Sequence, residues 1–410
     1  MNDKKKRWKG VTIVVALLVV TNLATFLISN LVSFAMPGGK VMVSRNVFNN
    51  IKGFEKLINI KEKLDKYYLN DYDFNKVIDG AAKGMVDAVG DPYTTYMDAE
   101  EFSDFFSQTE GNYVGLGIQV GVKDDKITVI TVFENSPAEK AGILSGDVIV
   151  GVDGKAMTGS DLQTAVSMMK GEAGQEVQLS LYRESKGDFE VTAVREEVEM
   201  VTVRSEMIDN EVGYIQVTMF DENTAENFQK AITTLEDSGM KSLIVDLRGN
   251  PGGLLDQTVK MASQFIEKGK NIVYTEDKYG NRKDYNSEGG IAQGLPLTVL
   301  TDGGSASASE IFTGAIKDYD AGTIVGTTTF GKGLVQTTFY REVDGFNDGT
   351  ALKVTISKYY TPNGQNIHGI GIEPDVVVEY PEELALAAYD RGKDPQFAKA
   401  LQIAREKIGN

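Results

Sequence analysis

Three alternating serines and one later lysine have the clearest chemical potential in this chain. Ser305, Ser307 and Ser309 stand at a predicted strand-to-helix junction, where helix N–H groups can stabilise negative charge. A serine is a poor nucleophile until a base removes its proton. The chain has one histidine, His368, and Lys332 is the only lysine near the serines that is flanked by glycines and apolar residues. The sequence therefore allows a serine activated by a buried lysine of lowered pKa. It equally allows serines that cap a helix and a lysine in a turn.

The composition excludes several other kinds of chemistry. The chain of 410 residues has no cysteine, so disulfides, thiolate zinc sites and cysteine nucleophiles are impossible. One histidine is too few for a His-rich metal site, and no metal or organic cofactor is implied. The net charge of −17 argues against nucleic acid as a partner, because phosphate binding needs a basic surface.

Two short motifs resemble sites of other enzyme classes. Residues 326–332 match the first seven positions of a P-loop, but Gly333 stands where that loop needs Ser or Thr, and a strand-like run follows instead of a helix. Ser167 and Lys170 have the Ser-x-x-Lys spacing of penicillin-binding enzymes, yet the Lys-Thr-Gly partner motif is absent. An ATPase that binds nucleotide through Lys332 is therefore a disfavoured alternative.

A second candidate site lies in the middle of the chain. Gly115, Leu116, Gly117 and Ile118 open a predicted strand, and their successive backbone N–H groups would form a nest for a carboxylate. Apolar residues beside the nest would hold the side chain of the same chain end. Together with residues 136–154, this stretch resembles a PDZ domain, a module that binds peptide tails.

The elements that must position these residues follow an α/β pattern. From residue 212 onward, predicted strands alternate with predicted helices, which indicates an α/β layer. The predicted strands cover 212–220, 242–247, 296–301, 322–327 and 334–340, and the predicted helices cover 224–238, 254–266 and 307–319. A β-rich stretch is expected from about residue 102 to 195, helical segments at 46–70 and 74–89, and a charged helical tail at 382–408.

The N-terminus has the pattern of a membrane anchor. Residues 1–9 have a local charge of +4, and no charged residue occurs from Val11 to Met36. This apolar run is long enough for a span of about 20 residues. The basic segment before it predicts that the N-terminus is cytoplasmic and the rest of the chain lies outside. The alternative is a cleaved secretory signal, since residues 33–35 resemble a cleavage site, although the run is longer than a signal core of 7–15 residues.

The chain as a whole resembles the carboxyl-terminal processing, or tail-specific, proteases, which combine a PDZ domain with a Ser-Lys peptidase core. The likeness covers nearly 300 residues in the order of that family. Besides the PDZ-like stretch and the serine and lysine segments, its motifs are Gly-Asp-Pro-Tyr-Thr-Thr-Tyr at 90–96, Asp-Leu-Arg-Gly-Asn-Pro-Gly-Gly at 246–253, Tyr-Tyr-Thr-Pro-Asn-Gly at 359–364 and Gly-Ile-Glu-Pro-Asp-Val at 371–376.

The resemblance assigns roles to individual residues. It implies that Ser307 is the nucleophile, Lys332 its general base and Gln336 the amide that orients the lysine amine without adding charge. It implies that backbone N–H groups of Ala308, Gly252 and Gly253 hold the oxyanion, where glycine suits close approach to substrate. It implies a structural role for His368 and leaves the role of Glu310 open.

The expected fold is α/β and multidomain. The expected divisions are a cytoplasmic basic segment (1–9), a transmembrane helix (10–36), an N-terminal helical arm (45–98), a PDZ domain (102–196), a Ser-Lys peptidase core (197–381) and a helical C-terminal tail (382–410).

The expected function is that of a membrane-anchored, extracytoplasmic serine endopeptidase. It would cleave proteins near their C-termini, while the PDZ domain recognises substrate tails and gates access. Amphipathic helices outside the core favour a homodimer, and a partner protein that activates the enzyme is possible. A non-catalytic PDZ scaffold is the alternative of a different class.

Overall fold

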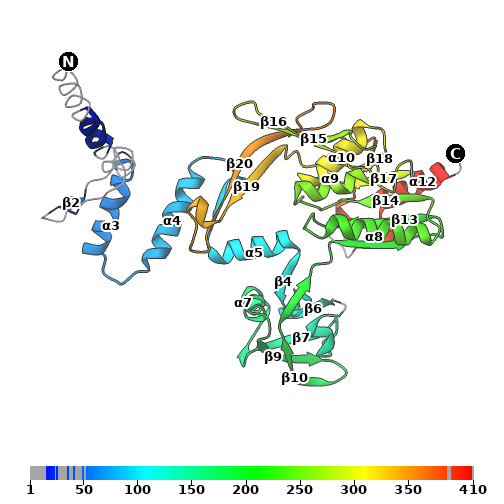
Figure 1. The fold of residues 1–410 in the computed structure, drawn as a ribbon. Coiled ribbons are helices and arrows are strands. Elements are labelled where there is room, and N and C mark those ends of the chain that lie inside the picture. Colours follow the sequence, from blue (N-terminus) through cyan, green and yellow to red (C-terminus); the bar gives the residue numbers. More distant parts are fainter. Residues whose placement is uncertain are drawn as a thin grey trace, which may run out of the picture. The chain divides into compact units, whose positions relative to one another are not determined.

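The computed structural model describes residues 15–23, 25, 35–36, 40–41, 49, 52–133, 135–385 and 389–408 (Figure 1). The chain divides into two compact units, Met1–Ile78 and Asp79–Asn410. The predicted basic segment 1–9 lies outside the described residues, and so does much of the predicted span 10–36, of which residues 15–23 are helical. Within the described part of the chain, no helix is both long and apolar enough to cross a membrane.

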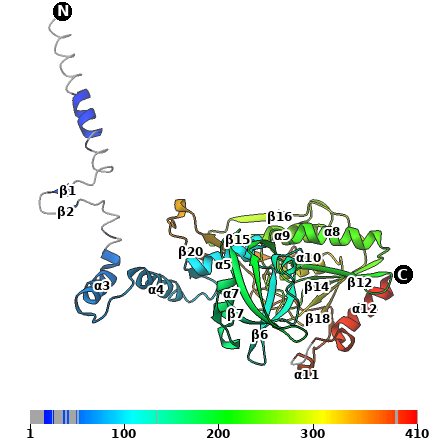
Figure 2. The same cartoon turned by 90° about the horizontal axis from the view of Figure 1, so that it is seen from below.

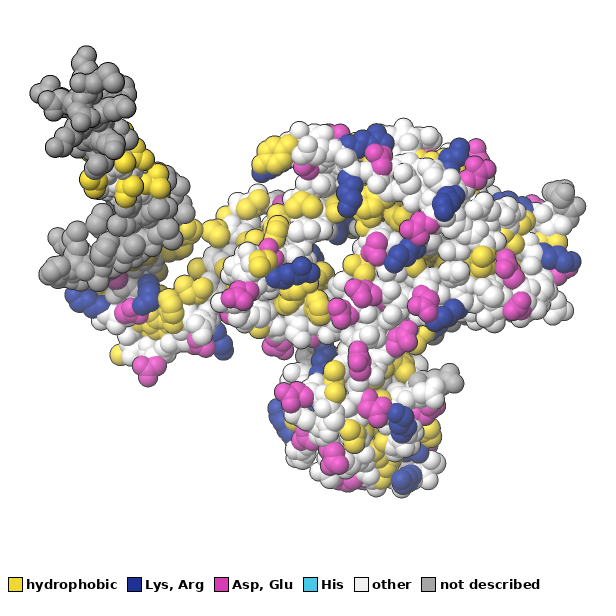
Figure 3. Space-filling model, viewed as in Figure 1, with side chains coloured by type: hydrophobic (Ala, Val, Ile, Leu, Met, Phe, Trp, Pro, Cys, Tyr) yellow, Lys and Arg dark blue, Asp and Glu magenta, His cyan; other side chains and the backbone are white. Residues whose placement is uncertain are grey.

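The first unit contains α3 (Glu55–Tyr67) and the start of α4 (Phe74–Asp87), so the two predicted helical segments are confirmed with shorter bounds. Two short strands, β1 (Ala35–Met36) and β2 (Lys40–Val41), pair with each other. Helix α3 has an acidic residue in its first turn and a basic one in its last, which suits the helix dipole. It buries none of its residues, and apolar side chains gather at the surface over it (Figure 3).

The second unit continues with helix α5 (Ala99–Glu110), where the sequence pattern predicted the start of a β-rich stretch. That prediction was wrong for residues 102–110. Asp98 and Glu101 form a reciprocal capping box at the start of α5, and Gly111 ends it in a left-handed conformation with φ 74°. These local signals favour a helix over residues 99–110.

The PDZ part is a small sheet with two helices. Its strands are β5 (Ile118–Lys123), β6 (Lys126–Val132), β7 (Val148–Val152), β8 (Lys155–Ala156), β9 (Glu176–Arg183) and β10 (Gly187–Val194). They pair in the order β10-β9-β7-β6-β5, with β8 on β7. Alternate residues of β9 are buried, and helices α6 (Pro137–Lys140) and α7 (Leu162–Met169) close the core. The strands β4 (Asn112–Gly115) and β11 (Glu196–Glu199) pair antiparallel with each other. In the sequence, β4 precedes the strands of this sheet and β11 follows them.

The peptidase part is built on a second, mostly parallel sheet. Its strands are β12 (Val203–Met207), β13 (Val212–Val217), β14 (Ser242–Asp246), β17 (Leu297–Thr301), β18 (Thr323–Gly326) and β21 (Val376–Val377), in that order, and β12 alone among these described strands runs antiparallel to its neighbour. Its helices are α8 (Thr224–Asp237), α9 (Leu255–Ser263) and α10 (Ala308–Asp318). The alternation of strands and helices predicted from residue 212 is confirmed.

The C-terminal helix α12 (Pro395–Ile408) is part of this core. Residues of β13 and β14 alternate between two apolar clusters, one shared with α8, α9 and α10, the other with α12. These helices lie on opposite sides of the sheet (Figure 2). Phe397, Ala400 and Ala404 of α12 are buried there. The prediction that this helix lies outside the core was wrong, and its apolar face therefore gives no argument for a dimer.

An antiparallel sheet carries the lysine segment. It has the order β16-β15-β20-β19 and consists of β15 (Asn271–Asp277), β16 (Arg282–Asn286), β19 (Leu334–Phe339) and β20 (Ala351–Tyr360), with β3 (Thr95–Met97) also on β20. A register shift between Val335 and Gln336 marks the start of β19. The remaining short helices are α11 (Glu382–Ala385) and 3₁₀ turns at Gly159–Asp161, Glu342–Asp344 and Arg391–Lys393.

Candidate active site

Ser307 precedes the first residue of α10 in an unusual backbone conformation. Its φ is 54° and its ψ is −110°, a region that L-residues adopt at a cost of about 1–3 kcal/mol. Two contacts hold it there. The Ser307 N–H donates to Glu310 Oε2 at 2.9 Å, and the buried Tyr359 hydroxyl donates to the Ser307 carbonyl oxygen at 3.1 Å. These two hydrogen bonds hold the strained backbone and so fix the direction of the Ser307 side chain.

The three alternating serines have different environments. Ser305 is buried and its hydroxyl donates to the Leu247 carbonyl at 2.8 Å. Ser309 is buried and its hydroxyl donates to the Asn250 carbonyl at 2.9 Å. Ser307 alone of the three lines a cleft of about 610 Å³. Ser305 and Ser309 therefore have structural roles, but neither caps α10 as the alternative from the sequence expected, and Ser307 is the residue at the N-cap.

Lys332 lines the same cleft from the loop between β18 and β19. Burial lowers the pKa of Lys332, and the positive charge of Lys353 lowers it further, whereas Asp91 and Glu310 act in the opposite direction. Its ammonium lies 4.9 Å from the centre of the Tyr93 ring. The strand β19 begins two residues later, as predicted, so this loop lacks the helix of a nucleotide-binding site.

Gln336 lines the cleft from β19, and its amide nitrogen is buried without a hydrogen-bond partner. In the described part of the chain, no hydrogen bond joins the Lys332 amine to Ser307 or to Gln336. The fold therefore brings the three predicted residues to one cleft but does not connect them. Hydrogen bonds of catalytic groups are often long in unliganded enzymes and shorten when substrate binds.

The predicted oxyanion residues line the same cleft as Ser307, but the N–H group of one of them is already engaged. The Gly252 N–H donates to Asn250 Oδ1 at 2.9 Å, so it is not free for an oxyanion, and its prediction as a donor is corrected. Glycine is needed at 252 for another reason. The φ of this residue is +107°, and a Cβ here would lie 2.8 Å from the Ser307 Cβ. For the N–H groups of Ala308 and Gly253, no acceptor is found among the described residues.

Glu310 connects the nucleophile segment to the lysine segment, a role that the sequence reasoning left open. This fully buried carboxylate accepts hydrogen bonds from the backbone N–H groups of Ser307 (2.9 Å), Lys332 (2.8 Å) and Gly331 (2.7 Å), and from the Thr329 hydroxyl (2.6 Å). The Ser-x-x-Glu spacing of a capping box was the available sequence signal. One side chain thus fixes the distance between two backbone segments of the cleft.

A buried ion-pair network lies at the end of β14. Arg248 pairs with Asp246 at 2.7 Å and with Asp394, next to α12, at 2.8 Å. Tyr214 also donates to Asp246, at 2.8 Å. The network ties the segment before Gly252 to the C-terminal helix. The motif at 246–253 was recognised from the sequence, but this partner at Asp394 was not.

The segment predicted to form a carboxylate nest lies next to an aromatic side chain of the same chain. The Tyr113 ring packs against Gly115, and the backbone N–H groups of Gly117 and Ile118 near its hydroxyl favour the ionised form. Burial raises the pKa of Tyr113. The apolar residues beside the nest are the expected kind for a tail groove, namely Leu116, Ile118, Val120, Val166 and Met169. Gly117 has a φ of +73°, and a Cβ there would collide with Ser136.

The remaining sequence motifs do not line the cleft. His368 is exposed and packs its ring edge-on against Tyr93, with 6.4 Å between ring centres. Ser167 lies on α7 with Met169, whose side chain is in the PDZ core, and Lys170 pairs with Asp104 at 2.5 Å. None of these residues lines the cleft of Ser307 in the described part of the chain.

Comparisons with known proteins agree with this architecture. Residues 211–378 match the model of peptidase family S41, residues 114–192 the PDZ domain, and residues 21–101 the N-terminal domain of the activating protease CtpB. The carboxy-terminal processing protease CtpA of Bacillus subtilis (strain 168) is 38% identical over 365 residues, which cover 89% of this chain and 77% of that protein.

Two further relatives extend the comparison. A probable CtpA-like serine protease of Staphylococcus haemolyticus is 34% identical over 414 residues, covering 99% of this chain and 81% of that one. The crystal structure of a putative S41 protease from Bacteroides fragilis shares the fold with a TM-score of 0.55 at 18% identity, covering 83% of this chain and 93% of that one. The chain therefore belongs to the carboxy-terminal processing proteases, serine-type enzymes with an S41 peptidase core and a PDZ domain.

Proposed function

We propose that this protease cleaves peptide bonds by a Ser-Lys dyad. The Ser307 Oγ attacks the substrate carbonyl carbon while the neutral Lys332 amine takes its proton. The resulting ammonium returns this proton to the leaving amine, and an ester to Ser307 remains. Water then attacks the ester carbonyl while the Lys332 amine takes its proton. The bond between the acyl carbon and Ser307 Oγ breaks, the Lys332 ammonium returns the proton to that oxygen, and the acid product leaves. The N–H groups of Ala308 and Gly253 face the oxyanion in both steps, and Gln336 orients the amine.

The observation that carries this proposal is the shared cleft. Ser307 alone of the three serines lines it, together with a half-buried lysine whose pKa is lowered, and Glu310 holds both backbones. The test is cleavage of an unfolded protein such as casein by the purified chain. Ser307→Ala and Lys332→Ala should each abolish cleavage, while Ser305→Ala should retain measurable activity because its hydroxyl contacts only backbone and Asp302.

The PDZ part is proposed to bind the free C-terminus of a substrate and to gate its access to the cleft. An extended tail would add as a strand beside β5, with its carboxylate at the nest of residues 115–118. The apolar groove supports this role. Peptides with a free C-terminus should bind and be cleaved better than the same peptides with an amidated end. Equal affinities would contradict tail recognition.

A scaffold that binds tails without cleaving them is the alternative of a different class. It would need neither a strained serine nor a lysine of lowered pKa in the same cleft, so the geometry favours the enzyme. Tail binding by wild type and Ser307→Ala without cleavage by either would support the scaffold.

The catalytic part is proposed to act outside the cytoplasmic membrane, held by the apolar N-terminal segment. The support is the +4 segment followed by an uncharged run from Val11 to Met36. A reporter enzyme that is active only outside the cytoplasm, fused after Asn410, tests this topology. Activity of the fusion in the cytoplasm would overturn it.

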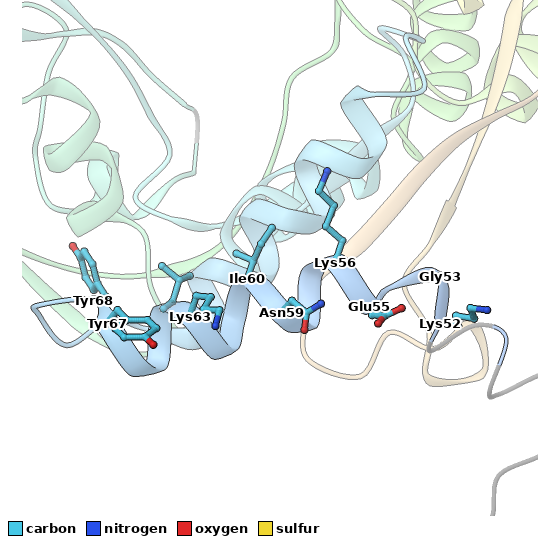
Figure 4. Close-up of a pocket in the computed structure, with 10 residues that line it drawn as sticks. Lys52, Gly53, Glu55, Lys56, Asn59, Ile60, Lys63, Tyr67 and Tyr68 are labelled. Carbon is cyan, nitrogen blue, oxygen red and sulfur yellow. The ribbon is translucent and has the colours of Figure 1, made fainter.

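A homodimer through α3 is proposed, with an activating partner protein as a further possibility. Helix α3 exposes Leu57, Ile58 and Ile60 without an apolar partner among the described residues, and the sticks in Figure 4 show Ile60 and its neighbours along this helix. Residues 21–101, which include α3, match the N-terminal domain of an activating protease, which supports a regulatory role for this segment. Light scattering of wild type and Leu57→Glu tests the dimer, which the variant should dissociate.

A further inference from the structure

The active-site cleft contains a second lysine that the proposed mechanism does not use. Lys353 lies on β20, directly opposite Thr338 of β19, while Gln336 lies opposite Thr355. Residues directly opposite each other in an antiparallel pair share a face of the sheet. Lys353 is thus on the same face as Gln336, and it lines the cleft together with Ser307 and Lys332.

Lys353 has no acidic partner in the described part of the chain. Its ammonium is half-buried, which lowers the pKa of Lys353, and it lies 4.9 Å from the centre of the Phe105 ring, a contact that favours the charged form. Glu110 and Glu222 line the same cleft, but neither forms an ion pair with Lys353 or Lys332 among the described residues. Cations that are removed from water are normally paired with an acid, so a half-buried lysine without an acidic partner in a catalytic cleft calls for a functional explanation.

The charged groups that face Lys332 come from several elements. Asp91, in the loop before β3, and Glu310, on α10, both favour its ammonium form, and so does the ring face of Tyr93. Lys353 is the group of like charge that opposes them, in addition to burial. A general base must be neutral to accept a proton, so these carboxylates work against the reaction and Lys353 works for it.

We propose that Lys353 is a positioning residue of the dyad, a fixed positive charge that repels the ammonium form of Lys332 and so keeps the general base neutral. This proposal rests on the proposed Ser-Lys function. A neighbouring cation is a known physical means of making a lysine amine available as a nucleophile or base, because two like charges in a partly desolvated site are costly. Lys353 itself touches neither Ser307 nor the reacting bond.

The first test is the pH dependence of kcat/KM for a tail peptide. Lys353→Met keeps the apolar stem but removes the charge, and Lys353→Arg keeps a charge that does not titrate. In the methionine variant, the rise of kcat/KM with pH should occur at higher pH. Its activity should therefore fall severalfold on the acidic side of the profile and recover at high pH. The arginine variant should keep the wild-type limb. Lys358→Met, an exposed lysine on the same strand outside the cleft, is the matched control and should leave the profile unchanged.

The second test does not depend on activity. In a Ser307→Ala background, pulses of acetic anhydride across a pH series modify only neutral amines. Mass spectrometry of the peptide that contains Lys332 then follows its titration directly. The onset of labelling should move to higher pH when Lys353 is replaced by Met and not when it is replaced by Arg. Thermal unfolding of each variant verifies that it is folded.

The outcomes separate this inference from the function on which it rests. Unmoved profiles in Lys353→Met, by rate and by labelling, would overturn the role of Lys353 and leave the dyad standing. A change in KM without movement of the limb would also overturn it, and would assign Lys353 to substrate binding. Activity in Lys332→Ala would overturn the dyad itself, while the labelling would still report whether Lys353 controls the charge of Lys332.

Discussion

Replacement of Glu310 by glutamine should disconnect the two halves of the active site. The carboxylate accepts four hydrogen bonds, two at each oxygen. A glutamine has one carbonyl oxygen and one NH₂ group, and the NH₂ group would face donors instead of accepting from them. If the amide nitrogen takes the Oε2 position, the N–H groups of Ser307 and Lys332 both lose their acceptor. In the other orientation the amide nitrogen takes the Oε1 position. The Gly331 N–H then loses its acceptor, and the Thr329 hydroxyl faces an NH₂ group to which it cannot donate.

The size of the effect follows from these two lost acceptors. Each buried donor left unsatisfied costs about 1–3 kcal/mol, so the stability of the core should fall by about 2–6 kcal/mol. Because the Ser307 conformation is strained, it should relax once its N–H is released, and a displacement of about 1 Å at a reacting group can cost about 100-fold in rate. We expect kcat to fall at least to that extent in Glu310→Gln.

Urea unfolding and peptide-cleavage rates measure the two effects on the same protein. Thr329→Val is the comparison variant, because it removes one bond to Glu310 and leaves the N–H groups of Ser307 and Lys332 bound. The Thr329 hydroxyl also accepts from the Ile372 N–H, so this variant should lose stability as well. It should keep most of its kcat. Equal losses of kcat in the two variants, or wild-type rates in Glu310→Gln, would refute the positioning role of this carboxylate.

Three other changes test separate parts of the structure. Lys332→Arg keeps the charge but cannot lose a proton, so cleavage should be lost at every pH, and a retained rate would contradict the dyad. The wild type should gain activity as the pH rises through the lowered pKa of Lys332. Tyr113→Phe removes the hydroxyl beside the predicted tail nest, so affinity for peptides with a free C-terminus should rise about two- to tenfold by calorimetry. An unchanged or lower affinity would show that the hydroxyl does not compete. Phe397→Ala should lower the free energy of unfolding by about 3–5 kcal/mol in urea titrations, because this side chain is buried against the sheet. A much smaller decrease in the free energy of unfolding would indicate that α12 lies outside the core.

Short-range patterns in the sequence determined the elements and the kinds of chemistry available. Hydrophobic periodicity predicted the strands and helices from residue 212 onward, because each strand and helix must bury one side in the same core. The absence of cysteine and the presence of one histidine left lysine as the plausible base. The pattern failed at α5, where a capping box and a C-terminal glycine decide the local structure. It failed again at α12, because the sequence of an amphipathic helix does not say what covers its apolar face.

Tertiary structure decided which of the chemically equivalent residues face the cleft. Ser305 and Ser309 donate to carbonyls of a neighbouring loop, and only the fold brings those carbonyls to them. The Gly252 N–H is engaged by a side chain two residues away, whereas Glu310 joins segments about 20 residues apart. The register of β19 and β20 places Lys353 on the same face as Gln336, in the cleft that Ser307 and Lys332 also line. Charge and hydrogen-bond partners act over distances of a few ångströms in space, and sequence separation does not specify those distances.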